Sequence, residues 1–267
     1  MHSLLQKLAY RTMRLRPLNL ERRSATNDAI ARRILADGIA VVPWRDLFGE
    51  DACQSVLFQR LKAEAVAFSR RPQQHDAKDW KSGYLKRRYK PGEQIEPESP
   101  LHEFLADSRL AAVLRAFFGS PYRLLAADYW HSVPTIDAPA GSQRWHSDPE
   151  DTVMCKVFLY FSNVDSDAGA TDFLPGSQVG GDASLRRFEI PGTSGRYYSD
   201  AEMKEVLAHG VRPIKACGPE GSLVFINTTG IHRGGRGSKD RLMGNFIFVS
   251  PWCPLPARWN GRRQTAG

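Results

Sequence analysis

The sequence predicts a mainly β protein, a sandwich or barrel, with α-helices that flank the β core on its N-terminal side. From residue 122 onward, apolar runs of strand length recur between glycine, proline, aspartate and serine residues, which is typical of short strands joined by turns. Before that point, apolar residues recur at helical spacing. No repeat or linker divides the 267 residues, so we expect a single domain over residues 1–267.

Residues 24–120 are predicted to form a helical flank. Ser24 is a candidate N-cap for a helix to about residue 35, and residues 38–42 form a short strand that ends at a proline. Apolar spacing predicts two further helices, over 51–69 and 108–118. Residues 70–100 are basic, aromatic and rich in Pro and Gly, so we expect a loop there and consider it a candidate lid.

Residues 121–250 are predicted to form the β core. One amphipathic helix, capped by Ser199 and extending to about residue 208, interrupts the strands. The expected strands cover residues 122–133, 153–164, 171–174, 187–190, 211–216, 222–226, 231–233 and 241–249. This number of short strands favours a closed or double-layered β architecture.

Composition excludes several classes of protein. No apolar run approaches the roughly 20 residues of a membrane span, and the N-terminus lacks the apolar segment of a secretory signal. The four cysteines are scattered without a C-x-x-C pair, which argues against a thiolate zinc site. We therefore expect a cytoplasmic protein, since a reducing compartment is the default for a chain with scattered cysteines and no secretory signal.

The chain is basic, with a formal net charge of +8 and a pI near 9.5, which favours anionic partners in general. We expect a small-molecule substrate, polar or anionic. Residues 81–90 mix basic and aromatic side chains, so nucleic acid is an alternative partner, which we consider less favoured. Residues 1–23 form a basic tail; binding of this tail to a membrane surface is disfavoured because its apolar residues do not align on one helix face.

The most informative motif is His146-Ser-Asp148, read together with His232. In an extended chain, side chains two positions apart point to the same face, so His146 and Asp148 can hold one ion. His232 completes the set if the β fold returns the chain to the same place. Two imidazoles and one carboxylate, with open positions beside them, suit a non-haem Fe(II) oxygenase. We predict these three residues as metal ligands, with the nearby Glu150 and Asp151 as less suitably spaced competitors.

The motifs resemble those of the phytanoyl-CoA dioxygenase family of Fe(II)- and 2-oxoglutarate-dependent dioxygenases. The resemblance rests on the His146-Ser-Asp148 motif, on residues 157–169, 173–177 and 221–226, and on His232-Arg-Gly followed by Arg241. It implies a double-stranded β-helix (a cupin-like jelly roll) with the iron near one open end. It also implies Fe(II) as the metal, with 2-oxoglutarate and O2 as cosubstrates.

Under this resemblance, Arg241 is expected to bind the far carboxylate of 2-oxoglutarate, because a guanidinium offers a carboxylate two parallel donors. Arg236 is a rival for that role. Lys156 lies on a predicted strand and is expected either to neutralise a carboxylate inside the barrel or to lie in solvent at a sheet edge. Phe158 stands where relatives often carry a Trp against the cosubstrate. Tyr129 is expected to hydrogen-bond the keto acid or to be a core aromatic.

The expected reaction is hydroxylation of an unactivated C–H bond in a small polar or carrier-linked substrate, with release of succinate and CO2. Asp148 argues against a halogenase, because the resemblance implies a small residue at that position in halogenases. Desaturation and cyclisation remain open. Alternatives from other classes are a cupin-like metal oxygenase or isomerase without a keto acid, a nucleic-acid demethylase, and a non-catalytic binding module.

Overall fold

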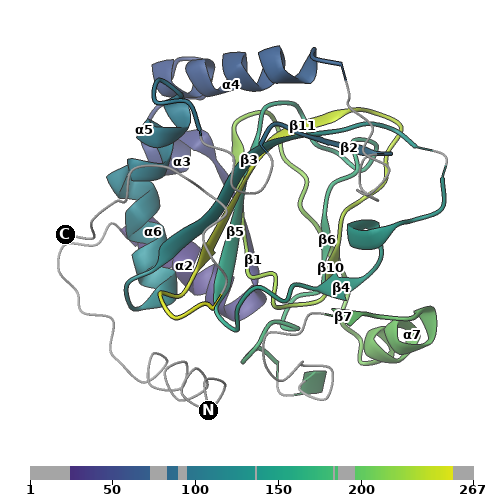
Figure 1. Ribbon diagram of the computed structural model, residues 1–267. Coiled ribbons are helices and arrows are strands. Elements are labelled where there is room, and N and C mark those ends of the chain that lie inside the picture. Colours follow the sequence, from purple (N-terminus) through teal and green to yellow (C-terminus); the bar gives the residue numbers. More distant parts are fainter. Residues whose placement is uncertain are drawn as a thin grey trace.

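The computed structural model describes residues 25–72, 83–89, 95–135, 137–182, 184–185 and 196–254. Two β-sheets face one another, and helices cover the outer face of the larger sheet (Figure 1). In chain order the elements are α2 (Ala25–Asp37), β1 (Ile39–Pro43), α3 (Trp44–Phe48), α4 (Val56–Ser69), β2 (Leu85–Arg87), α5 (Pro100–Ala106), α6 (Ser108–Phe118), β3 (Arg123–Ser132), the 3-10 helix η1 (Gly141–Gln143), β4 (His146–Ser147), β5 (Met154–Tyr160), β6 (Asp172–Phe173), β7 (Arg196–Tyr197), α7 (Asp200–Ala208), β8 (Ile214–Lys215), β9 (Ser222–Ile226), β10 (His232–Arg233) and β11 (Arg241–Val249).

The larger sheet has six strands in the order β1-β9-β5-β11-β3-β2, and the smaller sheet has five in the order β7-β4-β10-β6-β8. Neighbouring strands pair antiparallel in both sheets. From β3 to β6, and again from β8 to β11, consecutive strands of the chain alternate between the sheets. This arrangement confirms the predicted mainly β jelly roll with flanking helices.

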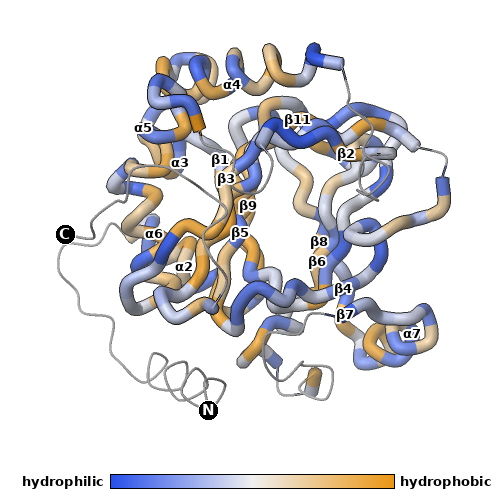
Figure 2. The backbone as a smooth tube through the Cα atoms, viewed as in Figure 1, coloured by the Kyte–Doolittle hydropathy of each residue, from blue (hydrophilic) through white to orange (hydrophobic). Residues whose placement is uncertain are grey.

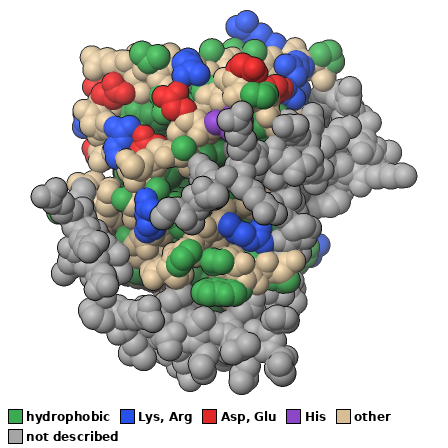
Figure 3. Space-filling view, turned by 60° about the vertical axis from the view of Figure 1, so that its left-hand side comes forward, with side chains coloured by type: hydrophobic (Ala, Val, Ile, Leu, Met, Phe, Trp, Pro, Cys, Tyr) green, Lys and Arg blue, Asp and Glu red, His purple; other side chains and the backbone are tan. Residues whose placement is uncertain are grey.

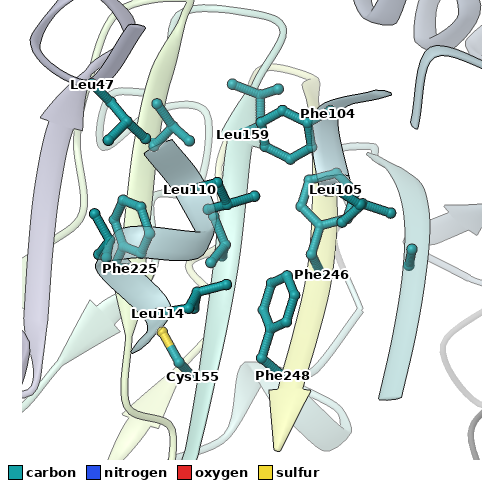
Figure 4. Close-up of a cluster of buried hydrophobic side chains, with 14 of the residues drawn as sticks. Leu47, Phe104, Leu105, Leu110, Leu114, Cys155, Leu159, Phe225, Phe246 and Phe248 are labelled. Carbon is teal, nitrogen blue, oxygen red and sulfur yellow. The ribbon is translucent and has the colours of Figure 1, made fainter. Parts of the chain in front are cut away.

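The central strand β5 separates the two layers of the core. Its residues alternate in direction, as expected for a strand: Val157 and Leu159 pack in the cluster formed with the helices, whereas Phe158 and Tyr160 belong to the cluster between the sheets. Figure 4 shows the helical side of this packing, where Leu114 and its neighbours lie against the apolar side chains of the sheet. In Figure 2 the apolar segments of α2, α6 and β5 gather along this contact.

Several predicted helices are confirmed, and two short helices were not predicted from the sequence. Helix α6 has the predicted bounds, and α7 begins directly after its expected N-cap, Ser199. Helix α4 begins later than predicted, because Ser55 is its N-cap. Helices α3 and α5 are too short for helical periodicity to reveal.

The region predicted as a helical flank also supplies strands. β1 pairs with β9 and β2 pairs with β3, so residues 24–120 extend the larger sheet at both edges. The basic tail 1–23, the expected strand 187–190 and parts of the candidate lid 70–100 lie outside the described residues. Within the described ranges, no helix combines the length and apolar character needed to cross a bilayer. On the face shown in Figure 3, the described acidic and basic side chains are interspersed.

Candidate metal centre and cosubstrate pocket

Three side chains with metal-binding groups converge between the two sheets. His146 of β4 and His232 of β10 are paired directly across antiparallel strands, and their ring centroids lie 4.2 Å apart. Asp148 follows β4, with Oδ1 3.7 Å from Nε2 of His146 and Oδ2 3.4 Å from Nε2 of His232. One ligand atom from each residue lies within 4.8 Å of the others. The structure therefore brings together the three residues that the sequence predicts as ligands.

Backbone carbonyls orient both imidazoles. Nδ1 of His146 donates to the carbonyl of Arg144 at 2.8 Å, and Nδ1 of His232 donates to that of Gly230 at 2.9 Å. Because Nδ1 carries the proton in each ring, Nε2 presents its lone pair towards Asp148, as a metal ligand requires. Burial and the neighbouring His232 lower the pKa of His146 to about 3. The ring is thus neutral at physiological pH and ready to bind a metal.

Asp148 is held as an anion. Burial alone would raise its pKa, but the pKa lies well below its usual value, and the adjacent Lys156 ammonium is the main cause of this lowering. A buried carboxylate and two imidazoles whose Nε2 atoms face it form the donor set that suits Fe(II). The residues present therefore fit a mononuclear iron ion.

We expect the metal-free protein to lose stability as the pH falls from about 6.5 towards 3. In the unfolded chain His146 takes up its proton near 6.5, but in the folded chain only near 3. Between these values the unfolded state binds more protons, so the free energy of unfolding decreases as the pH falls. The lowered pKa of Asp148 acts in the same direction at the acid end. Urea denaturation across this range should show a shallower pH dependence for His146→Gln; equal slopes in both proteins would contradict this assignment.

A cavity of about 170 Å³ lies beside the three ligands. Its wall includes Lys156, Phe158 and Arg241 from the larger sheet, and its rim includes Arg87 of β2 and Arg236. Of the expected cosubstrate residues, Lys156, Phe158 and Arg241 therefore share one cavity with the metal ligands.

Arg241 is buried at the start of β11. Its Nη1 donates to the carbonyl of Gly169, and Nη2 lies 3.4 Å from the hydroxyl of Ser132, but Nε has no hydrogen-bond partner among the described residues. A buried guanidinium that retains an unused N–H fits an anionic ligand such as a carboxylate. The rival Arg236 is exposed and donates to the backbone carbonyls of Thr135 and Asp137. The geometry therefore favours Arg241.

Lys156 points into the barrel. Strand β5 lies between β9 and β11, so the alternative of a solvent-exposed lysine at a sheet edge is wrong. Its Nζ lies 2.7 Å from Oδ2 of Asp148 and 3.8 Å from Oε1 of Glu150. The ammonium thus contacts a predicted metal ligand directly.

Tyr129 lies on the opposite face of β3 from the cavity. Its hydroxyl donates to Oε2 of Glu64 at 3.1 Å, and Glu64 also accepts from Ser99. The cavity is lined instead by the neighbouring strand residues Trp130 and Ser132. The expectation that Tyr129 binds the keto acid is therefore corrected: it is a core aromatic, the alternative that the sequence left open.

Replacing Tyr129 by phenylalanine tests this placement. We expect a loss of about 1 kcal/mol in the free energy of unfolding, because one hydrogen bond to Glu64 is removed while that from Ser99 remains. The melting temperature should fall by roughly 2–4 °C, and the affinity for 2-oxoglutarate should not change. Calorimetry and ligand titration measure the two quantities. A weakened affinity for 2-oxoglutarate in a folded variant would contradict the placement.

The two competing carboxylates have different surroundings. Asp151 accepts hydrogen bonds from the backbone N–H of Thr152 and from the N–H and hydroxyl of Ser250, so it ties two segments of chain together. Glu150 is buried and lines the cavity, and its Oε2 has no hydrogen-bond partner among the described residues. Glu150 thus offers an acceptor to a ligand. In the sequence, the spacing of Glu150 from His146 indicated only a less suitable metal ligand.

A jelly roll that holds two histidines, one aspartate and a buried arginine in one cavity defines a non-haem iron oxygenase that depends on 2-oxoglutarate. Residues 36–243 match the model of the family described as phytanoyl-CoA dioxygenase (PhyH). The chain belongs to this family.

Solved structures share the fold at low sequence identity. The α-ketoglutarate-dependent epimerase SnoN from nogalamycin biosynthesis is 16% identical, with a TM-score of 0.58 over 85% of this chain and 83% of that one. EctD from S. alaskensis, crystallised with iron, is 19% identical, with a TM-score of 0.57 over 91% and 83%. The carbocyclase SnoK is 13% identical, with a TM-score of 0.56 over 87% and 85%. No curated protein matches the sequence.

Proposed function

We propose that the protein hydroxylates an unactivated C–H bond of a small polar substrate and uses Fe(II), 2-oxoglutarate and O2, with release of succinate and CO2. The observation that carries this proposal is the buried Arg241, whose Nε lacks a partner among the described residues and which shares its cavity with His146, Asp148 and His232. A metal oxygenase or isomerase that uses no keto acid has no need for a buried cation at this position.

The side chains of this cavity have separate roles. His146, Asp148 and His232 would hold the iron, which together with 2-oxoglutarate and O2 supplies the oxidising chemistry. Arg241 binds the far carboxylate of the keto acid and thereby sets its orientation. Phe158, buried in the cavity wall, forms an apolar surface against the cosubstrate. The buried position of these side chains keeps bulk water away from the reacting atoms.

The charges around the cavity support a polar substrate with an anionic part. Arg87 and Arg236, both exposed, place positive charge at the rim. Inside, the unpartnered Oε2 of Glu150 accepts a hydrogen bond from an N–H or O–H group of the substrate. A carrier-linked acid is compatible with the same rim. We keep the cytoplasm as the proposed compartment because no disulfide joins the cysteines in the described part of the chain.

Ring closure and epimerisation are the outcomes to separate from hydroxylation, because structures of this fold include an epimerase and a carbocyclase. Product mass distinguishes them: hydroxylation adds one oxygen atom, epimerisation leaves the mass unchanged and ring closure removes two hydrogen atoms. Nucleic acid as substrate gains no support from the described surface in Figure 3, where charges of both signs are mixed.

The decisive experiment adds Fe(II) and then 2-oxoglutarate to the metal-free protein without oxygen. We expect the visible charge-transfer band of an iron–keto-acid complex, followed on exposure to air by formation of succinate. A protein that binds one iron but develops no band would contradict the dependence on a keto acid. A protein that takes up no iron would contradict the metal centre itself.

A further inference from the structure

Lys156 contacts the one predicted metal ligand that has two equivalent donor atoms. Its Nζ lies 2.7 Å from Oδ2 of Asp148, and the side chains of both residues are only about one-tenth exposed, at 11% and 10%. Oδ2 also lies 3.4 Å from Nε2 of His232, and the other oxygen, Oδ1, lies 3.7 Å from Nε2 of His146 and has no ammonium beside it. The two oxygens of Asp148 therefore have different surroundings before any metal binds.

This difference matters because a carboxylate binds a metal through one oxygen or through both. With two imidazoles, a one-oxygen carboxylate leaves three of six octahedral positions open. A two-oxygen carboxylate takes a fourth position and leaves only two, which 2-oxoglutarate alone would fill. An ion pair in a buried setting holds its partners firmly, since separating them leaves an uncompensated charge.

We propose that Lys156 is a positioning residue whose ammonium forms an ion pair with Oδ2 of Asp148, keeps this carboxylate a one-oxygen ligand and so preserves a metal position for O2. The inference rests on the proposed function and deepens it. It also assigns Lys156 a role different from the one expected from the sequence, in which the ammonium would neutralise a carboxylate of the cosubstrate or the substrate.

The backbone of Lys156 and the position of its ammonium are both held by neighbouring residues. Lys156 lies within β5, where it pairs with Ile226 of β9 and Ile247 of β11, so its backbone is fixed in the middle of the larger sheet. Glu150 lies on the same side of the cavity, with Oε1 3.8 Å from the ammonium, and supplies a second negative charge. The ammonium therefore links the larger sheet to the segment that follows β4.

The test counts metal-bound water with Mn(II), whose inner-sphere waters accelerate the relaxation of solvent protons. In wild type we expect a contribution from three waters on the Mn(II) protein, and from one after saturation with 2-oxoglutarate. In Lys156→Met we expect the contribution without the keto acid to fall by about a third, as Asp148 takes a fourth position. With 2-oxoglutarate bound, the variant should lose the remaining water contribution.

Two variants serve as controls. Lys156→Arg keeps a cation at Oδ2 and should retain the wild-type relaxation. Lys239→Met removes another lysine of the cavity wall, one that pairs with Asp165 at 3.0 Å and Asp167 at 3.3 Å, and should also leave the relaxation unchanged. Lys156→Ala replaces the methionine variant if the latter does not fold.

An unchanged Mn(II) relaxation in a folded Lys156→Met protein overturns the inference. It does so even if 2-oxoglutarate binds more weakly, because that pattern indicates direct contact between the ammonium and the keto acid. The proposed function fails separately: wild type would then bind Mn(II) with three waters but lose none of them on addition of 2-oxoglutarate.

Discussion

Replacement of His232 by alanine is expected to weaken Fe(II) binding by more than about 100-fold, since loss of an outer hydrogen-bond partner of a metal ligand alone costs roughly 10- to 100-fold. His232 is buried, its Nε2 lies 3.4 Å from Asp148, and its Nδ1 is fixed to the carbonyl of Gly230. Apart from His146, no other histidine of the described chain joins this ligand group. The variant retains only one imidazole and one carboxylate, too few to hold the ion.

Equilibrium dialysis with Fe(II) under anaerobic conditions measures this loss directly. His131→Ala is a matched control, because His131 lies on β3, pairs with Asp240 at 2.8 Å and is not part of the ligand group. We expect the control to bind one iron as wild type does, and the keto-acid band to disappear only in His232→Ala. Tight stoichiometric iron binding by His232→Ala would show that the metal centre lies elsewhere.

Replacement of Arg241 by methionine should weaken the binding of 2-oxoglutarate by roughly 30-fold or more, equivalent to about 2 kcal/mol or more. The physical reason is that the far carboxylate of the keto acid would lose its buried cation and remain desolvated without a partner. Iron binding should be unaffected, because Arg241 is not part of the ligand group. Titration of 2-oxoglutarate into the Fe(II) protein, followed by the charge-transfer band, gives the affinity.

Two further variants complete this experiment. Arg236→Met removes the exposed guanidinium at the rim and should leave the affinity for 2-oxoglutarate close to that of wild type. Arg241→Lys keeps the positive charge but cannot form the bidentate hydrogen bonds of a guanidinium, so we expect an intermediate affinity for 2-oxoglutarate. If Arg236→Met weakens the binding and Arg241→Met does not, the rival assignment holds.

The features that the sequence predicted well are those that local patterns encode. Strands β9 and β11 have the predicted bounds because continuous apolar runs between turn residues mark buried strands. Helix α7 begins where the Ser199 cap predicts, since a cap satisfies the N–H groups at the start of its own helix. The grouping of His146, Asp148 and His232 followed from their order and residue types together with a known family pattern.

What the sequence by itself determined was the fold class, the metal-binding set and the candidate cation Arg241. The tertiary structure alone decided that Tyr129 faces Glu64 on the helical side of β3 and that Lys156 reaches Asp148 from the opposite sheet. It also decided that β1 and β2 complete the larger sheet. The reason is physical. In a strand, side chains alternate between the two faces of the sheet, so the sequence shows that neighbouring residues point in opposite directions. Which of these faces meets the cavity depends on how distant strands pair and on how the two sheets close on one another.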